Sequence, residues 1–238
     1  MGLITYDTLR SYAYSNDRLI SGPIRGLVFD FMGLGNQDMH SEDTPRGIRL
    51  AGKGIIHLIP YFDPWCWMND QTVAFCDELR DVLFDHYGLD DGTPVIASGE
   101  SMGGLCALVY THYARHTPVT CVTNCPVCDA AFHFTERPDL PRTFYAAFGA
   151  AEDFDAALKA HSPLHIAAQM PDIRYVQFHC ATDEAVNKEK HSDRFVEAMR
   201  PGHRVEYIEV EGQGHCKLNP ADRERYNASL EEDILNRQ

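Results

Sequence analysis

The sequence predicts an α/β protein with a largely parallel central sheet that helices cover on both faces. Short apolar runs alternate with segments of helical hydrophobic spacing from residue 25 to the end of the chain. Residues 94–104 combine a buried strand, a tight turn around a serine, and a run of small, helix-forming residues. No repeat, low-complexity segment or linker rich in Pro, Gly and Ser divides the 238 residues. We therefore expect one domain over residues 1–238.

The N-terminal half is expected to begin at a sheet edge and to continue into buried strands. Residues 1–24 alternate weakly and contain turn formers, which is typical of one or two short edge strands. The pattern then predicts these elements in chain order: a strand at 25–31, a helix at 44–53, a strand at 55–59, an amphipathic helix at 73–87 and a strand at 95–97. Gly88 is expected to end the long helix.

The C-terminal half continues this alternation, with one interruption. Residues 125–162 contain three prolines and several aromatic residues, and they predict a small helical insertion over the strand ends. Around the insertion we expect these elements: a helix at 104–115, a strand at 119–124, a helix capped by Ser162 with Pro163 in its first turn, a strand at 173–180, a helix at 188–200, a strand at 205–210 near the sheet edge, and a helix at 221–236.

Ser101 lies in the motif with the clearest chemical meaning. Residues 99–103, GESMG, fit G-x-S-x-G between an apolar strand and a helix. Such a turn is expected to strain the Ser101 backbone, and Gly99 and Gly103 leave room where neighbouring backbone passes closely. The Ser101 hydroxyl would then lie at a helix N-terminus, where the Met102 amide and the helix dipole stabilise a developing anion. The alternative is a Gly- and Ser-rich turn without chemistry.

Candidates for a base and an acid follow Ser101 in the chain. Asp183 and His215 each come just after a predicted strand, as Ser101 does, and chemistry in such sheets lies at the carboxyl ends of the strands. The order Ser, Asp, His is typical of a nucleophile elbow. His215 would take the serine proton, since Gly212 and Gly214 before it let its loop fold back over the site, and Asp183 would orient the imidazole. The rival candidates are other histidines for the base and nearby carboxylates for the acid: His57, His179 and His191, and Glu184 and Asp193.

A second oxyanion donor is expected in the loop at 32–36, Met-Gly-Leu-Gly-Asn, which follows the first buried strand. Gly33 and Gly35 allow the backbone to turn so that the Leu34 amide points into the site. An ordinary strand-to-helix turn is the alternative. The pattern is no dinucleotide-binding fingerprint, because the third glycine is missing.

An aromatic loop at 61–69 is expected to contact the substrate. It holds both tryptophans of the chain, Trp65 and Trp67, beside Tyr61 and Phe62. This concentration is typical of the wall of an apolar substrate pocket. The alternative is a loop packed onto the core.

Together these motifs resemble the α/β-hydrolases, nearest to the catalytic domain of the prolyl-oligopeptidase and dienelactone-hydrolase-like branch. The resemblance covers about residues 25–236 and is carried by GESMGG, SPLHIAA, HCATDEAV, GQGH and FMGLG. It implies an α/β-hydrolase fold with Ser101 as nucleophile, Asp183 as acid and His215 as base. It further implies that the amides of Met102 and Leu34 form the oxyanion hole.

The sequence departs from this branch in three respects, one of them an abbreviated front of the expected sheet. Met32 stands where many relatives have a histidine before the glycine of the oxyanion loop. The N-terminal propeller of the larger oligopeptidases is also missing from the sequence. These absences weaken a peptidase interpretation more than an esterase interpretation.

Composition limits the partners and the cell compartment. The formal net charge of −14 argues against nucleic acid and anionic membranes, which require a basic surface. The chain has no apolar run of the ~20 residues that cross a bilayer, and its first residues lack the features of a signal peptide. We therefore expect a cytoplasmic enzyme without a metal or organic cofactor. The sequence does not indicate the oligomeric state.

Eight cysteines are expected to be reduced thiols, since no export signal is recognised. Cys121, Cys125 and Cys128 form a C-x3-C-x2-C run that could suggest zinc. However, Cys121 falls in an apolar strand-like run, and no second pair with finger-like spacing follows. Buried or pocket-lining thiols are the preferred interpretation.

The sequence thus favours a serine hydrolase that cleaves a small carboxylic ester through an acyl-enzyme. A peptidase or amidase for short peptides is the enzymatic alternative, with Glu100 as a candidate to hold a free amine. A hydrolase fold used only for binding is the non-enzymatic alternative. Acyl transfer to an alcohol in place of water is compatible with the same residues.

Overall fold

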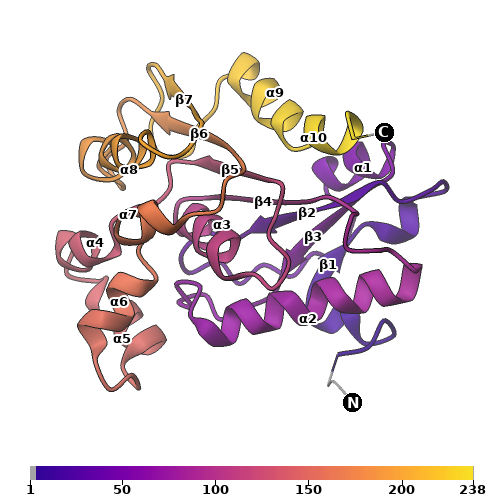
Figure 1. The fold of residues 1–238 in the computed structure, drawn as a ribbon, viewed down its shortest axis with the longest axis horizontal. Coiled ribbons are helices and arrows are strands. Elements are labelled where there is room, and N and C mark those ends of the chain that lie inside the picture. The colour runs from indigo at the N-terminus through magenta and orange to yellow at the C-terminus, as the bar shows by residue number, and fades with distance from the viewer. Residues whose placement is uncertain (1–3, 238) are drawn as a thin grey trace.

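The computed structural model describes residues 4–237, which form a seven-stranded sheet with the order β1-β3-β2-β4-β5-β6-β7. Only β1 is antiparallel to its neighbour, and the other pairs are parallel. The strands are β1 (Ala13–Ser15), β2 (Gly26–Phe31), β3 (Ile55–Pro60), β4 (Val95–Glu100), β5 (Thr120–Asn124), β6 (Arg174–Cys180) and β7 (Val205–Val210). The predicted mostly parallel sheet is confirmed (Figure 1).

Helices cover both faces of this sheet. They are α1 (Pro45–Ala51), α2 (Asp70–Tyr87), α3 (Met102–Tyr113), α4 (Ala130–Glu136), α5 (Pro141–Phe148), α6 (Phe154–Ala160), α7 (Pro163–Ile166), α8 (Arg194–Met199), α9 (Pro220–Ser229) and α10 (Glu232–Leu235). In Figure 1, α2 and α3 lie on the opposite side of the sheet from α1, α9 and α10. No helix within residues 4–237 is long and apolar enough to cross a membrane.

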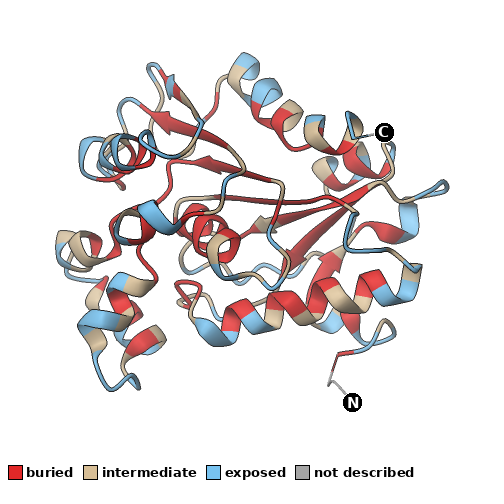
Figure 2. Ribbon diagram, viewed as in Figure 1, coloured by how far each residue is buried: buried red, intermediate tan, exposed pale blue. Residues whose placement is uncertain are grey.

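The strands supply apolar side chains to both layers. In β2, Leu27 and Phe29 pack in the core with α2 and α3, whereas Val28 between them packs with α1 and α9. Successive side chains of a strand point to opposite faces, so a strand between two helical layers must be apolar on both. The central strands are accordingly buried along most of their length (Figure 2).

The long helix α2 begins earlier than hydrophobic spacing predicts. The Asn69 side chain accepts a hydrogen bond from the Thr72 amide at 3.0 Å and caps the first turn, so the helix begins at Asp70. Gly88 ends it with a φ of 64°, in the left-handed region. The core-facing side of the helix buries Val73 and Leu83, with Cys76 and Leu79 between them.

The last predicted helix is interrupted in the structure. Residues expected to form one helix at 221–236 form α9 and α10, separated at Glu231. The Glu231 side chain turns inward to form ion pairs with Arg49 and Lys53 of the α1 region. These contacts with a sequence-distant segment are favoured over continuation of the helix.

Residues 125–162, for which a helical insertion is predicted, contain α4, α5 and α6, and α7 follows them before β6; these helices lie at one side of the sheet in Figure 1. Ser162 occupies the predicted N-cap position of α7, with Pro163 in the first turn, but its side chain makes no capping hydrogen bond there. Its hydroxyl instead accepts a hydrogen bond from the Ala130 amide at 2.9 Å. Ser162 therefore joins α7 to the start of α4.

Candidate active site

Ser101 occupies a strained turn between β4 and α3. Its φ of 57° and ψ of −123° are unusual for a residue with a side chain. A Cβ on Gly99 would lie 2.2 Å from the Gly103 carbonyl oxygen, and one on Gly103 would lie 2.0 Å from the Phe31 carbonyl oxygen. Only glycine fits at either position, which confirms the predicted crowding around the turn.

Ser101 lines a cavity of about 440 Å³ at the carboxyl ends of the strands. Leu34, Met102 and His215 line the same cavity. A larger cavity of about 640 Å³ lies beside it and shares Gly33 and Glu100 with it. Because Ser101 and His215 line only the smaller of these two cavities, we take the smaller as the candidate active site.

Two backbone amides at this cavity are free to donate hydrogen bonds. Met102 is the first residue of α3, where an amide has no partner inside the helix. The loop that holds Leu34 is shaped by a hydrogen bond from Gly35, whose φ is 76°, to the Pro64 carbonyl. Among the described residues, neither the Met102 nor the Leu34 amide has an acceptor. Both predicted oxyanion donors therefore border the cavity with unused N–H groups.

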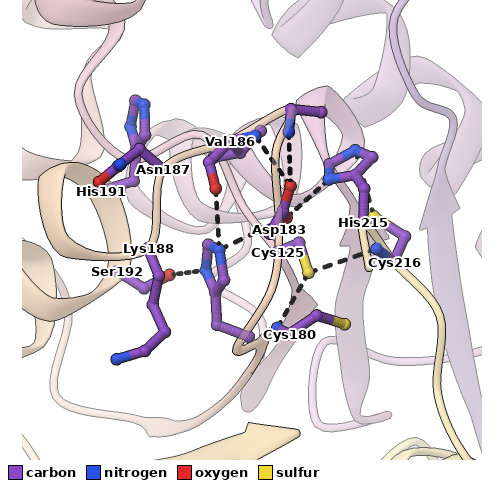
Figure 3. A network of polar contacts seen from close by, with 12 residues as sticks. Cys125, Cys180, Asp183, Val186, Asn187, Lys188, His191, Ser192, His215 and Cys216 are labelled. Carbon is purple, nitrogen blue, oxygen red and sulfur yellow. Dashed lines mark hydrogen bonds and ion pairs between the residues drawn. The ribbon is translucent and has the colours of Figure 1, made fainter. Parts of the chain in front are cut away.

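The structure brings His215 and Asp183 into direct contact. His215 Nδ1 lies 2.7 Å from Asp183 Oδ2, and the other carboxylate oxygen accepts the amides of Ala185 and Val186 (Figure 3). The loops that follow β6 and β7 are tied together by hydrogen bonds from Thr182 to the carbonyl at residue 213. Both oxygens of the Asp183 carboxylate therefore have hydrogen-bond partners, and the His215 imidazole is oriented through its Nδ1 atom.

Burial and hydrogen bonding act in opposite directions on this pair. Burial raises the pKa of Asp183, but hydrogen bonds from His179, His215 and the Val186 amide outweigh it and lower the pKa. Burial lowers the pKa of His215, but its hydrogen bonds with Asp183 and Cys125 outweigh this and raise the pKa to about 9. Asp183 is therefore ionised at neutral pH, and His215 binds a proton readily.

His215 Nε2, the atom that would face a nucleophile, lies 3.5 Å from Cys216 Sγ. Within residues 4–237 no hydrogen bond joins His215 to the Ser101 hydroxyl, although both line one cavity. Hydrogen bonds between catalytic groups are often long or misaligned before substrate binds. The arrangement fits a site in which Nε2 exchanges its sulfur contact for Ser101 Oγ.

Comparison with solved structures shows which fold carries this arrangement. A puromycin hydrolase superposes with a TM-score of 0.70 at 17% identity, over 90% of this chain and 34% of that one. A thermophilic esterase from Thermogutta terrifontis superposes with a TM-score of 0.65 at 20% identity, over 94% of this chain and 87% of that one. The chain has the α/β-hydrolase fold. The resemblance predicted from the sequence motifs is confirmed at this level.

A third structure with this hydrolase fold is the acylaminoacyl peptidase of Pyrococcus horikoshii, with a TM-score of 0.69 at 12% identity. The superposition includes 89% of this chain and 37% of the peptidase. The chain thus spans about a third of the two longer proteins and most of the esterase. No protein-family model and no curated protein sequence matches the chain.

The rival candidates for base and acid lie elsewhere in the hydrolase fold. His57 is buried with Nε2 at 3.1 Å from Asp30, and His179 is buried with Nε2 at 3.1 Å from the Val186 carbonyl. Glu184 is exposed, and Asp193 accepts hydrogen bonds from Lys188 and Tyr207. His191 is buried beside α4. Of these residues only His179 approaches the pair, at 3.5 Å from Asp183 Oδ2, where it helps to hold the carboxylate.

The aromatic loop divides between two cavities of the hydrolase fold. Trp67 lines the Ser101 cavity, with its ring stacked on Phe144 at 3.9 Å. Trp65 and Tyr61 line a separate cavity of about 380 Å³. The prediction that Trp65 and Tyr61 line the same pocket as Ser101 is therefore wrong, because the loop places both rings in a different cavity. Sequence reasoning also missed His133 and Arg137, which line the Ser101 cavity from the helical insertion, where no recognisable motif marks them.

Potential metal ligands gather in three groups within the described chain, each with ligand atoms within 4.8 Å of one another. The groups are Cys125 with His215 and Cys216, Cys125 with His179 and Asp183, and His133 with Glu136 and His191. Contacts within the protein already join members of each group. Cys121 and Cys128 belong to none of these groups, so the three thiols of the C-x3-C-x2-C run do not converge on one point. Its three thiols are free and buried, as predicted.

Proposed function

We propose that this chain is a serine hydrolase that cleaves small carboxylic esters through an acyl-enzyme. The observation that carries the proposal is a strained Ser101 at the start of α3 in the same cavity as a His215–Asp183 pair with an N···O distance of 2.7 Å. A nucleophile, a base and an orienting carboxylate are the groups that acyl transfer to a hydroxyl requires.

In the proposed mechanism, His215 Nε2 takes the proton of Ser101 as Oγ attacks the ester carbonyl. The amides of Met102 and Leu34 donate hydrogen bonds to the oxyanion, and the α3 dipole adds to this stabilisation. Protonated His215 then gives its proton to the leaving alkoxide. Neutral His215 next activates a water molecule that hydrolyses the acyl-enzyme, while Asp183 stabilises each imidazolium that forms.

The size of the cavity supports a small substrate. At about 440 Å³ it lies in the lower part of the roughly 300–1,000 Å³ range of ligand pockets. We expect short acyl chains to be preferred over octanoate. The eight free thiols support a reducing compartment, so we propose that the enzyme acts in the cytoplasm.

A second candidate function is cleavage of short peptides or amides. Glu100 lines both the Ser101 cavity and the larger neighbouring one, where its carboxylate could hold a substrate amine. Burial, together with the nearby charge of Asp30, raises the pKa of Glu100, and an ammonium group would offset that effect. This function predicts turnover of aminoacyl amides or dipeptides that Glu100→Gln weakens.

Labelling with a fluorophosphonate, run beside hydrolysis of p-nitrophenyl esters from acetate to octanoate, tests the nucleophile. We expect the wild type to label and Ser101→Ala to lose labelling and about 10⁴-fold or more of kcat/KM. Ser21→Ala is the matched control, because Ser21 is exposed and precedes β2 at the opposite end of the sheet. Full activity of Ser101→Ala would overturn the proposal. A wild type that neither labels nor hydrolyses any ester would favour the binding-protein alternative.

A further inference from the structure

A second histidine faces the candidate active site from the helical insertion. His133 belongs to α4, whose first turn is capped by Asp129, and its ring lines the Ser101 cavity. The Trp67 ring meets it edge-on, with centroids 5.7 Å apart. Burial lowers the pKa of His133, and its hydrogen bond with Glu136 only partly offsets this. His133 is therefore a neutral imidazole at neutral pH.

A chain of hydrogen bonds determines which nitrogen of this imidazole carries the proton. It begins at His191 Nδ1, which lies 3.2 Å from the Cys128 amide and 3.1 Å from the Asp129 amide. A backbone N–H can only donate, so Nδ1 of His191 is an unprotonated acceptor. In the neutral ring Nε2 then holds the hydrogen, and it donates to Glu136 Oε2 at 2.9 Å.

The Glu136 carboxylate, which accepts from His191, also determines which nitrogen of His133 carries the hydrogen. Burial raises the pKa of Glu136, but hydrogen bonds from His133 and His191 outweigh it and lower the pKa to about 2. An ionised carboxylate accepts hydrogen bonds only, so His133 Nδ1, its partner, must donate. A neutral ring that donates from Nδ1 has a bare lone pair on Nε2. No group within residues 4–237 donates to that atom.

We propose that His133 Nε2 is a hydrogen-bond acceptor that selects substrates with a neutral O–H or N–H donor beside the scissile ester. The inference deepens the proposed function, on which it rests, by naming a chemical feature of the substrate. A neutral donor is sufficient for this acceptor, because the neutral His133 ring offers a lone pair and no negative charge. A substrate without a donor would leave this lone pair unsatisfied in a partly enclosed pocket.

Two pairs of esters test the preference on each side of the scissile bond. The p-nitrophenyl esters of N-acetylglycine and 4-oxopentanoic acid differ only by an N–H in place of a CH₂ in the acyl group. The esters 2-hydroxyethyl acetate and propyl acetate differ by a hydroxyl in place of a methyl in the leaving group. We expect wild-type kcat/KM to favour the donor member of at least one pair by about 3- to 10-fold. Ratios near one in both pairs would overturn the proposal.

His133→Phe keeps an aromatic ring beside Trp67 but removes the lone pair, so we expect the wild-type ratio to fall to about one. His86→Phe is the matched control, because His86 lies in the exposed last turn of α2, outside the cavity. It should keep the wild-type ratio. A ratio that survives His133→Phe would show that another group selects the donor and would overturn the proposal.

A measurement that needs no substrate separates this inference from the proposed function. Long-range proton–nitrogen NMR correlations of the wild type should show a neutral His133 with hydrogen on Nδ1 and none on Nε2 at pH 7. Hydrogen on Nε2 would overturn the acceptor role even if Ser101 hydrolyses esters. If Ser101 proves inactive but the Nδ1–H tautomer is found, the proposed function fails while the acceptor stands.

Discussion

Two histidines, each paired with a carboxylate, line one cavity, and their pKa values shift in opposite directions. His215, in the loop after β7, keeps 28% of its side chain exposed and has a pKa raised to about 9. His133, in α4, is 3% exposed and has a lowered pKa. Burial acts to lower the pKa of both rings, and a carboxylate acts to raise both. In the partly exposed His215 the carboxylate has the larger effect and the pKa rises, whereas in the enclosed His133 burial has the larger effect and the pKa falls.

The difference teaches that a carboxylate partner alone does not make a histidine a base. His215 binds a proton readily and lines the cavity beside Ser101, which suits a group that takes and returns a proton. His133 stays neutral and is held in one tautomer by a hydrogen-bond chain from the backbone. It suits recognition of a substrate group better than proton transfer.

The largest expected effect separates the two histidines directly. His215→Ala should lower kcat/KM for p-nitrophenyl acetate by about 10⁴-fold or more, since the proton acceptor is lost. His133→Ala should lower it by less than about 10-fold, because no bond-making step uses that ring. Steady-state kinetics with active-site titration measures both. Comparable losses in the two variants would mean that the roles of the rings are not distinct.

The two carboxylates should differ next. Asp183→Asn should lower kcat by about 10³- to 10⁴-fold, because an amide can hold the wrong tautomer of His215 and cannot stabilise its cation. Glu136→Gln should cost less than about 10-fold, since its side-chain oxygen can still accept from both neighbouring rings. The same ester assay compares them, with circular dichroism to verify folding. A loss in Glu136→Gln as large as that in Asp183→Asn would contradict the comparison.

Folding stability should also depend on Glu136, because its carboxylate accepts hydrogen bonds from two buried imidazoles. Glu136→Ala should destabilise the protein by about 1–3 kcal/mol, because it leaves ring N–H groups of His133 and His191 buried without an acceptor. The pKa of Glu136 is lowered from 4.5 to about 2, so its ionised form stabilises the fold above about pH 4.5, and this stabilisation is lost as the pH falls toward 2. Urea unfolding at pH 7 and at pH 3 checks both statements. A mutational loss that is equal at both pH values would contradict the ionised role.

The smallest effect concerns the pH profile. Since His215 must be neutral to accept the serine proton, its raised pKa means that kcat/KM should increase with pH above 6.5, toward about 9. Cys125→Ala should move this limb to lower pH, because Cys125 contributes to the raised pKa. Profiles of kcat/KM for wild type and variant measure the shift. An unchanged limb in Cys125→Ala would assign the whole rise to Asp183.

The sequence by itself determined most of the fold and the strained turn at Ser101. Strand and helix patterns are local, and the crowding that demands Gly99 and Gly103 follows from the strand–turn–helix motif. The positions of Ser101, Asp183 and His215 were predictable for the same reason. Each follows a strand, and parallel strands end at one edge of the sheet.

Only the tertiary structure decided which side chains line the cavity. Trp65 and Trp67 are two residues apart, yet only Trp67 reaches the cavity, because positive φ angles at Trp67 and Met68 turn the loop and Phe144 from the insertion stacks on the ring. The sequence did not predict that His133 lines this cavity, for a similar reason. Its tautomer depends on Glu136, on His191 near α8, and on two backbone amides, and only folding brings these groups together. Directions of side chains in irregular segments are set by such distant partners, which no local pattern records.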